Sequence, residues 1–159
     1  MSNKRYPLVF IVEDNIAFSR VVEHHLKINN YENVMIFTSG EECLKNLYQK
    51  PDIIIQDYKL QGISGISVLQ RAKKVLQHTE FIFLSAQESI DIAVNTLQLG
   101  AFDYIVKNEV ALHRLLQKIE SIVNIQQLKK RNRIQKILIV LFVVLSIILL
   151  GMLIVRAYA

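Results

Sequence analysis

Short apolar runs alternate with stretches of helical periodicity over most of the chain. The runs are rich in β-branched and aromatic residues and occupy residues 8–12, 34–37, 53–55, 81–84 and 104–106. Between them, apolar side chains recur every three or four residues, as at Phe18, Val22 and Leu26, which predicts helices. Apolar runs that are continuous, not alternating, are typical of parallel strands covered on both faces. Five strand–helix repeats therefore predict an α/β fold with one doubly wound, five-stranded parallel sheet.

Residues that start and stop helices fall between the predicted elements. Thr38 or Ser39 can cap the second helix, which has acidic residues in its first turn. Gly100 follows the fourth helix, where a C-terminal glycine is favoured. Neither Gly nor Pro occurs from residue 101 to residue 150, so the sequence predicts no end for the fifth helix in this range.

Polar or charged residues follow four of the five predicted strands. Glu13 and Asp14 follow the first strand, Asp57 the third, Ser85 the fourth and Lys107 the fifth. Because the carboxyl ends of parallel strands meet at one edge of a sheet, these side chains are expected to share a small site. Three carboxylates repel one another unless a cation holds them, and Mg²⁺ prefers such oxygen ligands. With an amine and a hydroxyl beside them, the carboxylates favour phosphoryl transfer to Asp57 as the nucleophile.

Four motifs at these strand ends match those of a known family. They are residues 12–14 (VED), 53–65 (IIIQDYKLQGISG), 84–86 (LSA) and 103–107 (DYIVK). Together they make the chain similar to the receiver domain of bacterial two-component response regulators, over roughly residues 7–128. The resemblance implies a CheY-like, flavodoxin-like fold, in which a parallel sheet of strand order 2-1-3-4-5 is flanked by five helices.

The resemblance also implies a role for each acid of the predicted site. Asp57 is expected to accept a phosphoryl group from the phosphohistidine of a histidine kinase. Asp14 and Asp57 are expected to bind Mg²⁺ directly, and Glu13 to hold a water on the ion. The backbone carbonyl of Lys59 is expected to complete the protein ligands.

Three further residues are expected to respond to the phosphoryl group. Lys107 would contact its oxygens, Ser85 would move toward it as a switch hydroxyl, and the ring of Tyr104 would turn inward. The chain departs from the usual family pattern at two places. Asn108 follows the lysine, where the family usually has Pro, and residues 60–61 (Leu-Gln) replace a frequent Met-Pro.

The positive charge of the chain is concentrated near its C-terminus. The formal net charge is +5. Residues 1–128 hold 13 basic and all 14 acidic residues, a net of −1, whereas residues 129–159 hold 6 basic residues and no acid. The predicted receiver domain therefore lacks the basic character that nucleic-acid binding requires, and no nucleic-acid partner is expected. The single cysteine, Cys43, excludes an internal disulfide and fits a reducing compartment.

Residues 137–155 form a long apolar run, broken only by Ser146 and Gly151. As a helix the run would span roughly 28 Å, close to the ~30 Å core of a bilayer, so a transmembrane helix is predicted. The basic segment 129–136 precedes it, and the positive-inside rule places the N-terminal domain in the cytoplasm. The predicted location is the cytoplasmic (inner) membrane of a bacterium, crossed once, with residues 156–159 as a short extracytoplasmic tail. The basic segment is either a topology signal alone or also a site for anionic lipid.

These observations favour a membrane-tethered, single-domain response regulator that acts through protein contacts. It is expected not to be an enzyme, beyond Mg-dependent self-phosphorylation and autodephosphorylation, and no output domain is expected after residue 128. The expected partners are a sensor histidine kinase or phosphotransfer protein, an unidentified downstream protein, and a second copy bound through the fourth helix, fifth strand and fifth helix. The alternative is a receiver-like scaffold that is never phosphorylated. A phosphatase of the haloacid dehalogenase type is disfavoured, because Lys59 occupies the position of its second Asp.

Overall fold

Five parallel strands form the sheet of the computed structural model, which describes the backbone of residues 6–158 and the side chains of residues 6–146, 152 and 156. The strands are β1 (Val9–Val12), β2 (Val34–Phe37), β3 (Ile53–Gln56), β4 (Glu80–Ser85) and β5 (Asp103–Val106). Their order in the sheet is β2-β1-β3-β4-β5. The predicted α/β class, the parallel sheet and the strand order 2-1-3-4-5 are therefore confirmed.

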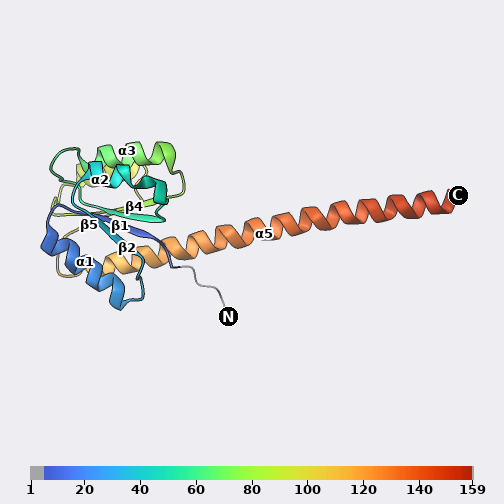
Figure 1. Ribbon diagram of the computed structural model, residues 1–159, viewed down its shortest axis with the longest axis horizontal. Helices are drawn as coiled ribbons and strands as arrows, with labels where there is room; N and C mark the ends of the chain where they lie inside the picture. Colours follow the sequence, from blue (N-terminus) through green and yellow to red (C-terminus); the bar gives the residue numbers. More distant parts are fainter. Residues whose placement is uncertain (1–5, 159) are drawn as a thin grey trace. The chain divides into compact units, whose positions relative to one another are not determined.

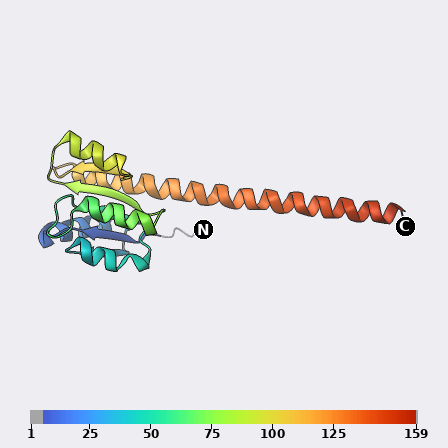
Figure 2. The same cartoon turned by 90° about the horizontal axis from the view of Figure 1, so that it is seen from above.

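Helices connect the strands and cover both faces of the sheet. They are α1 (Ile16–Ile28), α2 (Gly40–Lys45), the 3₁₀ helix η1 (Leu47–Gln49), α3 (Gly65–Val75), α4 (Ile90–Gln98) and α5 (Ala111–Tyr158). Figure 2 shows α2, α3 and α4 over one face of the sheet, and Figure 1 shows α1 on the other face with the first turns of α5. Each crossover thus returns the chain to a strand parallel to the one before it, as the alternation in the sequence predicts.

The strands are apolar along their length because both faces of the sheet are covered. Every residue of β1 and β3 is buried. The ring of Phe10 in β1 packs edge-on against Phe37 in β2, with 4.7 Å between the ring centroids. Val22 and Leu26 of α1 and Leu69 of α3 are buried as well. Full burial of one such side chain stabilises the fold by about 1.5–3 kcal/mol.

The strand register aligns the carboxyl ends of the strands at one edge of the sheet. The last residues of β1 and β3 are register partners, and so are the last residues of β4 and β5. Backbone hydrogen bonds extend this alignment one residue further. The N–H of Asp57 donates to the carbonyl of Val12 (2.9 Å), and the N–H of Lys107 donates to the carbonyl of Ser85 (2.8 Å). Residues that follow different strands therefore emerge next to one another.

The helix ends agree with the local sequence signals. The Ser39 hydroxyl accepts the N–H of Glu42 (3.2 Å), and the Glu42 carboxylate accepts the N–H of Thr38 (3.2 Å). Ser39 is thus the N-cap of α2, and the Glu42 side chain reaches back to the residue before the cap, a variant of the capping box. After α4, Gly100 has a φ of 97°, the left-handed conformation in which glycine commonly ends a helix. α5 continues through the range without Gly or Pro, as expected.

The chain divides into two compact units, residues 1–120 and residues 121–159. The first unit contains the sheet, α1 to α4 and the start of α5. The second unit consists of the continuation of α5, where the side chains of residues 137–145 are apolar and exposed.

The transmembrane helix predicted over residues 137–155 is not borne out. Across the described part of the chain, no helix has both the length and the apolar character that crossing a bilayer requires. The side chains of residues 147–151 and 153–155 lie outside the described residues. The predicted single-pass localisation in the inner membrane is therefore wrong.

Candidate functional site

Three carboxylates meet where β1 and β3 end. Glu13 and Asp14 follow β1, Asp57 follows β3, and one oxygen from each of the three lies within 4.8 Å of the others. Glu13 and Asp57 are buried, with exposed fractions of 4% and 8%, and Asp14 is half-buried. Oxygen ligands at this spacing suit a hard divalent cation such as Mg²⁺. The sheet thus brings together the three acids that the sequence assigns to a common site.

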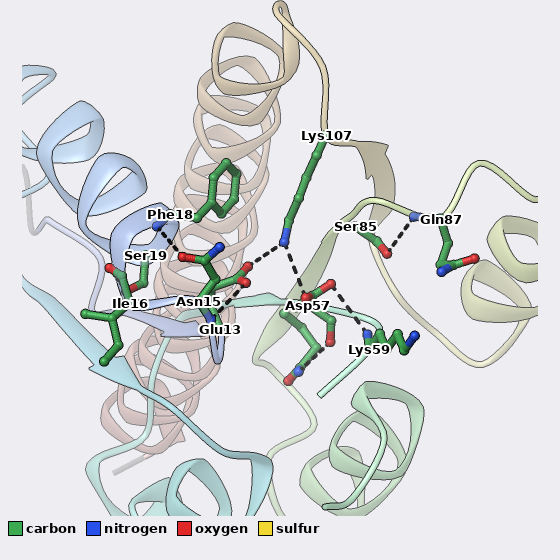
Figure 3. Close-up of polar contacts among 11 residues, drawn as sticks. Glu13, Asn15, Ile16, Phe18, Ser19, Asp57, Lys59, Ser85, Gln87 and Lys107 are labelled. Carbon is green, nitrogen blue, oxygen red and sulfur yellow. Dashed lines mark hydrogen bonds and ion pairs between the residues drawn. The ribbon is translucent and has the colours of Figure 1, made fainter. Parts of the chain in front are cut away.

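The ammonium of Lys107 lies against two of these carboxylates (Figure 3). Its Nζ donates to Oε2 of Glu13 at 2.7 Å and to Oδ2 of Asp57 at 3.3 Å. Because Lys107 follows β5, these ion pairs connect the ends of three strands. The ring of Phe18, from α1, covers the same ammonium, with its centroid 4.5 Å from Nζ. The lysine therefore offsets part of the repulsion among the three acids.

The carboxyl group of Glu13 has a raised pKa. Burial is the largest cause, and the negative charge of Asp57 acts in the same direction. The hydrogen bond and the positive charge of Lys107 oppose this shift, and so does the hydrogen bond from the N–H of Asn15. Lys107 is therefore the principal group that favours the ionised form of Glu13.

The backbone around Asp57 is held by close contacts. Gln56 is fully buried, and its Nε2 donates to the backbone carbonyl of Asp57 at 2.8 Å. A Cβ on Gly65, the first residue of α3, would collide with the same carbonyl oxygen. The backbone N–H of Lys59 lies 3.5 Å from Oδ1 of Asp57, so the Lys59 backbone is beside the carboxylate. The carbonyl of Asp57 is thus held between the Gln56 side chain of β3 and the first residue of α3.

Ser85 and Tyr104 belong to the neighbouring strands β4 and β5, and both contact Gln87. The buried Ser85 hydroxyl accepts the N–H of Gln87 at 3.2 Å, and the Tyr104 hydroxyl donates to the Gln87 carbonyl at 2.9 Å. The Tyr104 ring is buried and stacks on Phe83, with 6.2 Å between centroids. Burial raises the pKa of Tyr104, and a hydrogen bond with Ser85 opposes that shift. The backbone of Gln87 therefore links the two hydroxyl groups.

Asn108 occupies the position where the family usually has Pro. Its Oδ1 accepts the N–H of Val110 at 3.2 Å, and its carbonyl accepts the N–H of Ala111 at 3.0 Å. These two bonds turn the chain from Lys107 into α5. The segment after the lysine is therefore stabilised by hydrogen bonds of the asparagine instead of a proline ring.

Sequence reasoning missed two residues that contact the site. It assigns Phe18 only to the apolar face of a helix, and it treats Gln56 only as a spacer between an apolar run and Asp57. The one available signal for Phe18 is that it lies only four residues after Asp14 in the sequence. The contact with Lys107 also requires the lysine side chain to reach from the end of β5 to the start of α1, which local periodicity does not specify.

A parallel sheet of this order, with an acidic cluster and a lysine at its carboxyl edge, defines the class of CheY-like receiver domains. The family model of the response regulator receiver domain matches residues 9–120, and the chain belongs to this family. The solved signal receiver domain of a putative LuxO repressor protein from Vibrio parahaemolyticus is 26% identical, with a TM-score of 0.71, covering 78% of this chain and 95% of that one. A CheY-like receiver domain protein from Methanospirillum hungatei is 27% identical, with a TM-score of 0.69, covering 76% and 96%.

Curated relatives match over the same region. The uncharacterized transcriptional regulatory protein YkoG of Bacillus subtilis is 33% identical over 114 residues, which are 71% of this chain and 49% of YkoG. The DNA-binding transcriptional regulator NtrC of Escherichia coli is 31% identical over 101 residues, 63% of this chain and 21% of NtrC. The chain thus spans about half or less of the length of these relatives.

Proposed function

We propose that this chain accepts a phosphoryl group on Asp57 in two-component signal transduction. The observation that carries the proposal is the convergence of Asp57 with Glu13, Asp14 and Lys107 at one edge of the sheet. Membership of the receiver family supports the same class of function. The proposed donor is the phosphohistidine of a sensor histidine kinase or of a phosphotransfer protein.

In the proposed reaction, a carboxylate oxygen of Asp57 attacks the phosphorus atom of the donor. A P–O bond forms and yields an acyl phosphate, while the P–N bond of the phosphohistidine breaks and its electron pair stays on the imidazole. The Lys107 ammonium donates hydrogen bonds to the phosphoryl oxygens, where it stabilises negative charge. Its distance of 3.3 Å from Oδ2 of Asp57 supports this role.

The acidic cluster is the proposed site of a Mg²⁺ ion. Asp14 and Asp57 would bind it directly, Glu13 would bind it through water, and the carbonyl of Lys59 would add an oxygen ligand. The mutual spacing of the carboxylates and the position of the Lys59 backbone beside Asp57 support this assignment. When bound, the ion neutralises charge on the carboxylates and on the transferred phosphoryl group.

Ser85 and Tyr104 are proposed to transmit the phosphorylation of Asp57. If the Ser85 hydroxyl moves toward the phosphoryl group, it gives up its hydrogen bond with the N–H of Gln87. Because the Tyr104 hydroxyl bonds to the carbonyl of the same residue, the segment leading into α4 would change together with the tyrosine. The proposed output is therefore a changed protein contact at the α4-β5-α5 face, with a downstream protein or a second copy.

We propose no contact of the receiver domain with nucleic acid and no enzymatic activity beyond turnover of its own phosphoryl group. Residues 1–128 carry a net charge of −1, which does not favour binding to a polyanion. The relatives that are named as DNA-binding or transcriptional regulators share only part of their length with this chain.

Mass spectrometry of the intact full-length chain tests the proposal directly. After incubation with Mg²⁺ and acetyl phosphate, the wild type should gain the mass of one phosphoryl group, and Asp57→Asn should gain none. Asp91→Asn, which changes an exposed carboxylate in α4, should behave like the wild type. Addition of EDTA should abolish the gain. A wild-type chain that takes no phosphoryl group from acetyl phosphate or phosphoramidate would contradict the proposal and favour a constitutive scaffold.

A further inference from the structure

Four residues around the rim of the sheet form a closed ring of contacts (Figure 3). Glu13 accepts the Lys107 ammonium with Oε2 (2.7 Å) and the N–H of Asn15 with Oε1 (3.3 Å). Asn15 caps α1, and its Oδ1 accepts the N–H of Phe18 at 3.1 Å. The ring of Phe18 then lies over Lys107, with its centroid 4.5 Å from Nζ. The turn that presents Glu13 therefore also places Phe18 on the lysine.

Phe18 differs from the core residues on its own helix. Val22 and Leu26, one and two turns further along α1, have exposed fractions of 1% and 0%, whereas Phe18 is half-buried at the rim of the site. The face of an aromatic ring carries partial negative charge and attracts an ammonium within about 6 Å of its centroid. The Lys107 side chain is only 18% exposed, so the ring acts on a partly desolvated cation. This placement indicates a role toward Lys107 in addition to packing.

We infer that Phe18 is a positioning residue for Lys107, an inference that rests on the proposed phosphoryl transfer to Asp57. A divalent cation on the acidic cluster would draw on two of the same carboxylate groups, Glu13 and Asp57, that accept hydrogen bonds from Lys107. The ring of Phe18 has no oxygen ligand, so its contact with the ammonium does not compete with the cation. Phe18 thus keeps the ammonium beside Asp57 while the carboxylates bind metal.

The length of the lysine side chain explains why such a contact matters. Lysine carries its charge on a flexible four-carbon stem, so a free ammonium explores many positions. A contact that restricts Nζ before the reaction reduces the entropy lost when the ammonium meets the phosphoryl oxygens. Phe18 supplies this restriction from α1, an element separate from the strand β5 that precedes Lys107.

The contact has a spectroscopic signature that requires neither metal nor phosphorylation. Protons above an aromatic face are shielded, so the ε-methylene resonances of Lys107 in the metal-free full-length chain should lie upfield of other lysine resonances. Their loss in Lys107→Arg assigns them. Phe18→Leu should return them to the ordinary position, and Phe18→Tyr should keep them upfield. Phe102→Leu is the matched control, because it changes a half-buried phenylalanine at the amino end of β5.

Phosphorylation rates with acetyl phosphate and Mg²⁺ test the consequence for the reaction. Phe18→Leu should slow the initial rate by about 2- to 10-fold, the range expected for loss of one partly desolvated cation–π contact. Phe18→Tyr and Phe102→Leu should react at nearly the wild-type rate, and circular dichroism should show that each variant is folded. Equal rates for wild type and Phe18→Leu, or equal slowing by Leu and Tyr, would overturn the inference.

The NMR measurement and the phosphorylation rates together distinguish failure of this inference from failure of the proposed function. An unshifted Lys107 resonance in the wild type overturns the positioning role even if Asp57 is phosphorylated normally. A wild type that takes no phosphoryl group refutes the proposed function and the positioning role with it, while an upfield Lys107 resonance still establishes the contact between ring and ammonium.

Discussion

The carboxylate of Glu41 joins α2 to the loop that follows Asp57. Its Oε1 accepts the N–H of Ile63 at 3.1 Å, between residues 22 positions apart in the sequence. The loop passes close to the carboxylate, since a Cβ on Gly62 would lie 2.7 Å from Oε1. Residues 60–61 lack the proline that the family often has there, so the loop has no proline ring to restrict its backbone. The hydrogen bond from the Ile63 N–H to Glu41 restrains the loop instead.

Replacement of Glu41 should therefore loosen the loop. Glu41→Ala removes the acceptor of the Ile63 N–H, so exchange of that amide with solvent should accelerate and the free energy of unfolding should fall by about 0.5–1 kcal/mol. Glu41→Gln keeps an acceptor oxygen and should retain most of the protection. Glu32→Ala, at an exposed acid near β2, serves as control. Unchanged exchange of the Ile63 amide in Glu41→Ala would contradict the restraint.

Replacement of Asp14 should raise the stability of the fold without metal and lower it, relative to the wild type, when Mg²⁺ is present. In EDTA, Asp14→Asn relieves repulsion among the three carboxylates and should stabilise the fold by up to about 1 kcal/mol. Mg²⁺ at about 100 times its dissociation constant should stabilise the wild type by about 2.7 kcal/mol, and Asp14→Asn much less. Thermal unfolding with Mg²⁺ and with EDTA measures both. Glu32→Gln should respond like the wild type, and an undiminished Mg²⁺ effect in Asp14→Asn would exclude Asp14 as a ligand.

Two glycines should respond differently to alanine. The Cβ of Gly65→Ala meets the backbone carbonyl of Asp57, so the backbone must shift, and overpacking of this kind costs about 1–3 kcal/mol. Gly100 has open space around it, so Gly100→Ala should lower the free energy of unfolding only through its left-handed φ, by about 1–2 kcal/mol. Gly65→Ala should lower both the unfolding temperature and the rate of phosphorylation. Gly100→Ala should lower the unfolding temperature alone. Normal phosphorylation of a folded Gly65→Ala chain would refute the strict fit around Asp57.

The thiol of Cys43 should be inert in the folded protein. Burial, aided by the negative charge of Glu42, raises its pKa to about 12, and the side chain is inaccessible to solvent. Because the thiolate is the reactive form, labelling with iodoacetamide at about pH 8 should be negligible in native buffer and rapid in denaturant. Mass spectrometry measures the extent of labelling. Rapid native labelling that matches the unfolded rate would show that α2 does not bury this residue.

The ion pairs of Glu23 should contribute stability that depends on pH. Hydrogen bonds from Lys27 and Arg20 lower the pKa of this carboxyl below its ordinary 4.5. A lowered folded-state pKa means that the contribution is complete above 4.5 and disappears as the pH falls through the lower folded value. Glu23→Gln should cost about 0.5 kcal/mol at neutral pH and nothing in strong acid, because exposed pairs are weak. Denaturant unfolding of wild type and Glu23→Gln across this pH range measures the difference in the free energy of unfolding. A difference that persists in strong acid would contradict the assignment.

Local sequence determined the strands and the residues that end them. Each apolar run became a strand, and the runs of β1 and β3 are buried throughout, because a continuous apolar run needs cover on both faces. Once parallel strands were expected, Asp57 and Lys107 had to meet at one edge, because the carboxyl ends of such strands lie together. The acidic cluster was predictable for this reason, before any distance was known.

Contacts between distant segments were decided only by the tertiary structure. The ring of Phe18 on Lys107, the Glu41 carboxylate on the Ile63 amide and the shared bonds of Ser85 and Tyr104 to Gln87 all join separate elements. Periodicity shows which face of a helix is apolar, but not which strand end that face meets. Hydropathy likewise predicted a membrane span over residues 137–155 that the described helix does not provide. The strand pattern alone therefore places the charged residues at one edge of the sheet, whereas the packing of helices against that edge selects which neighbouring residues contact each charged group.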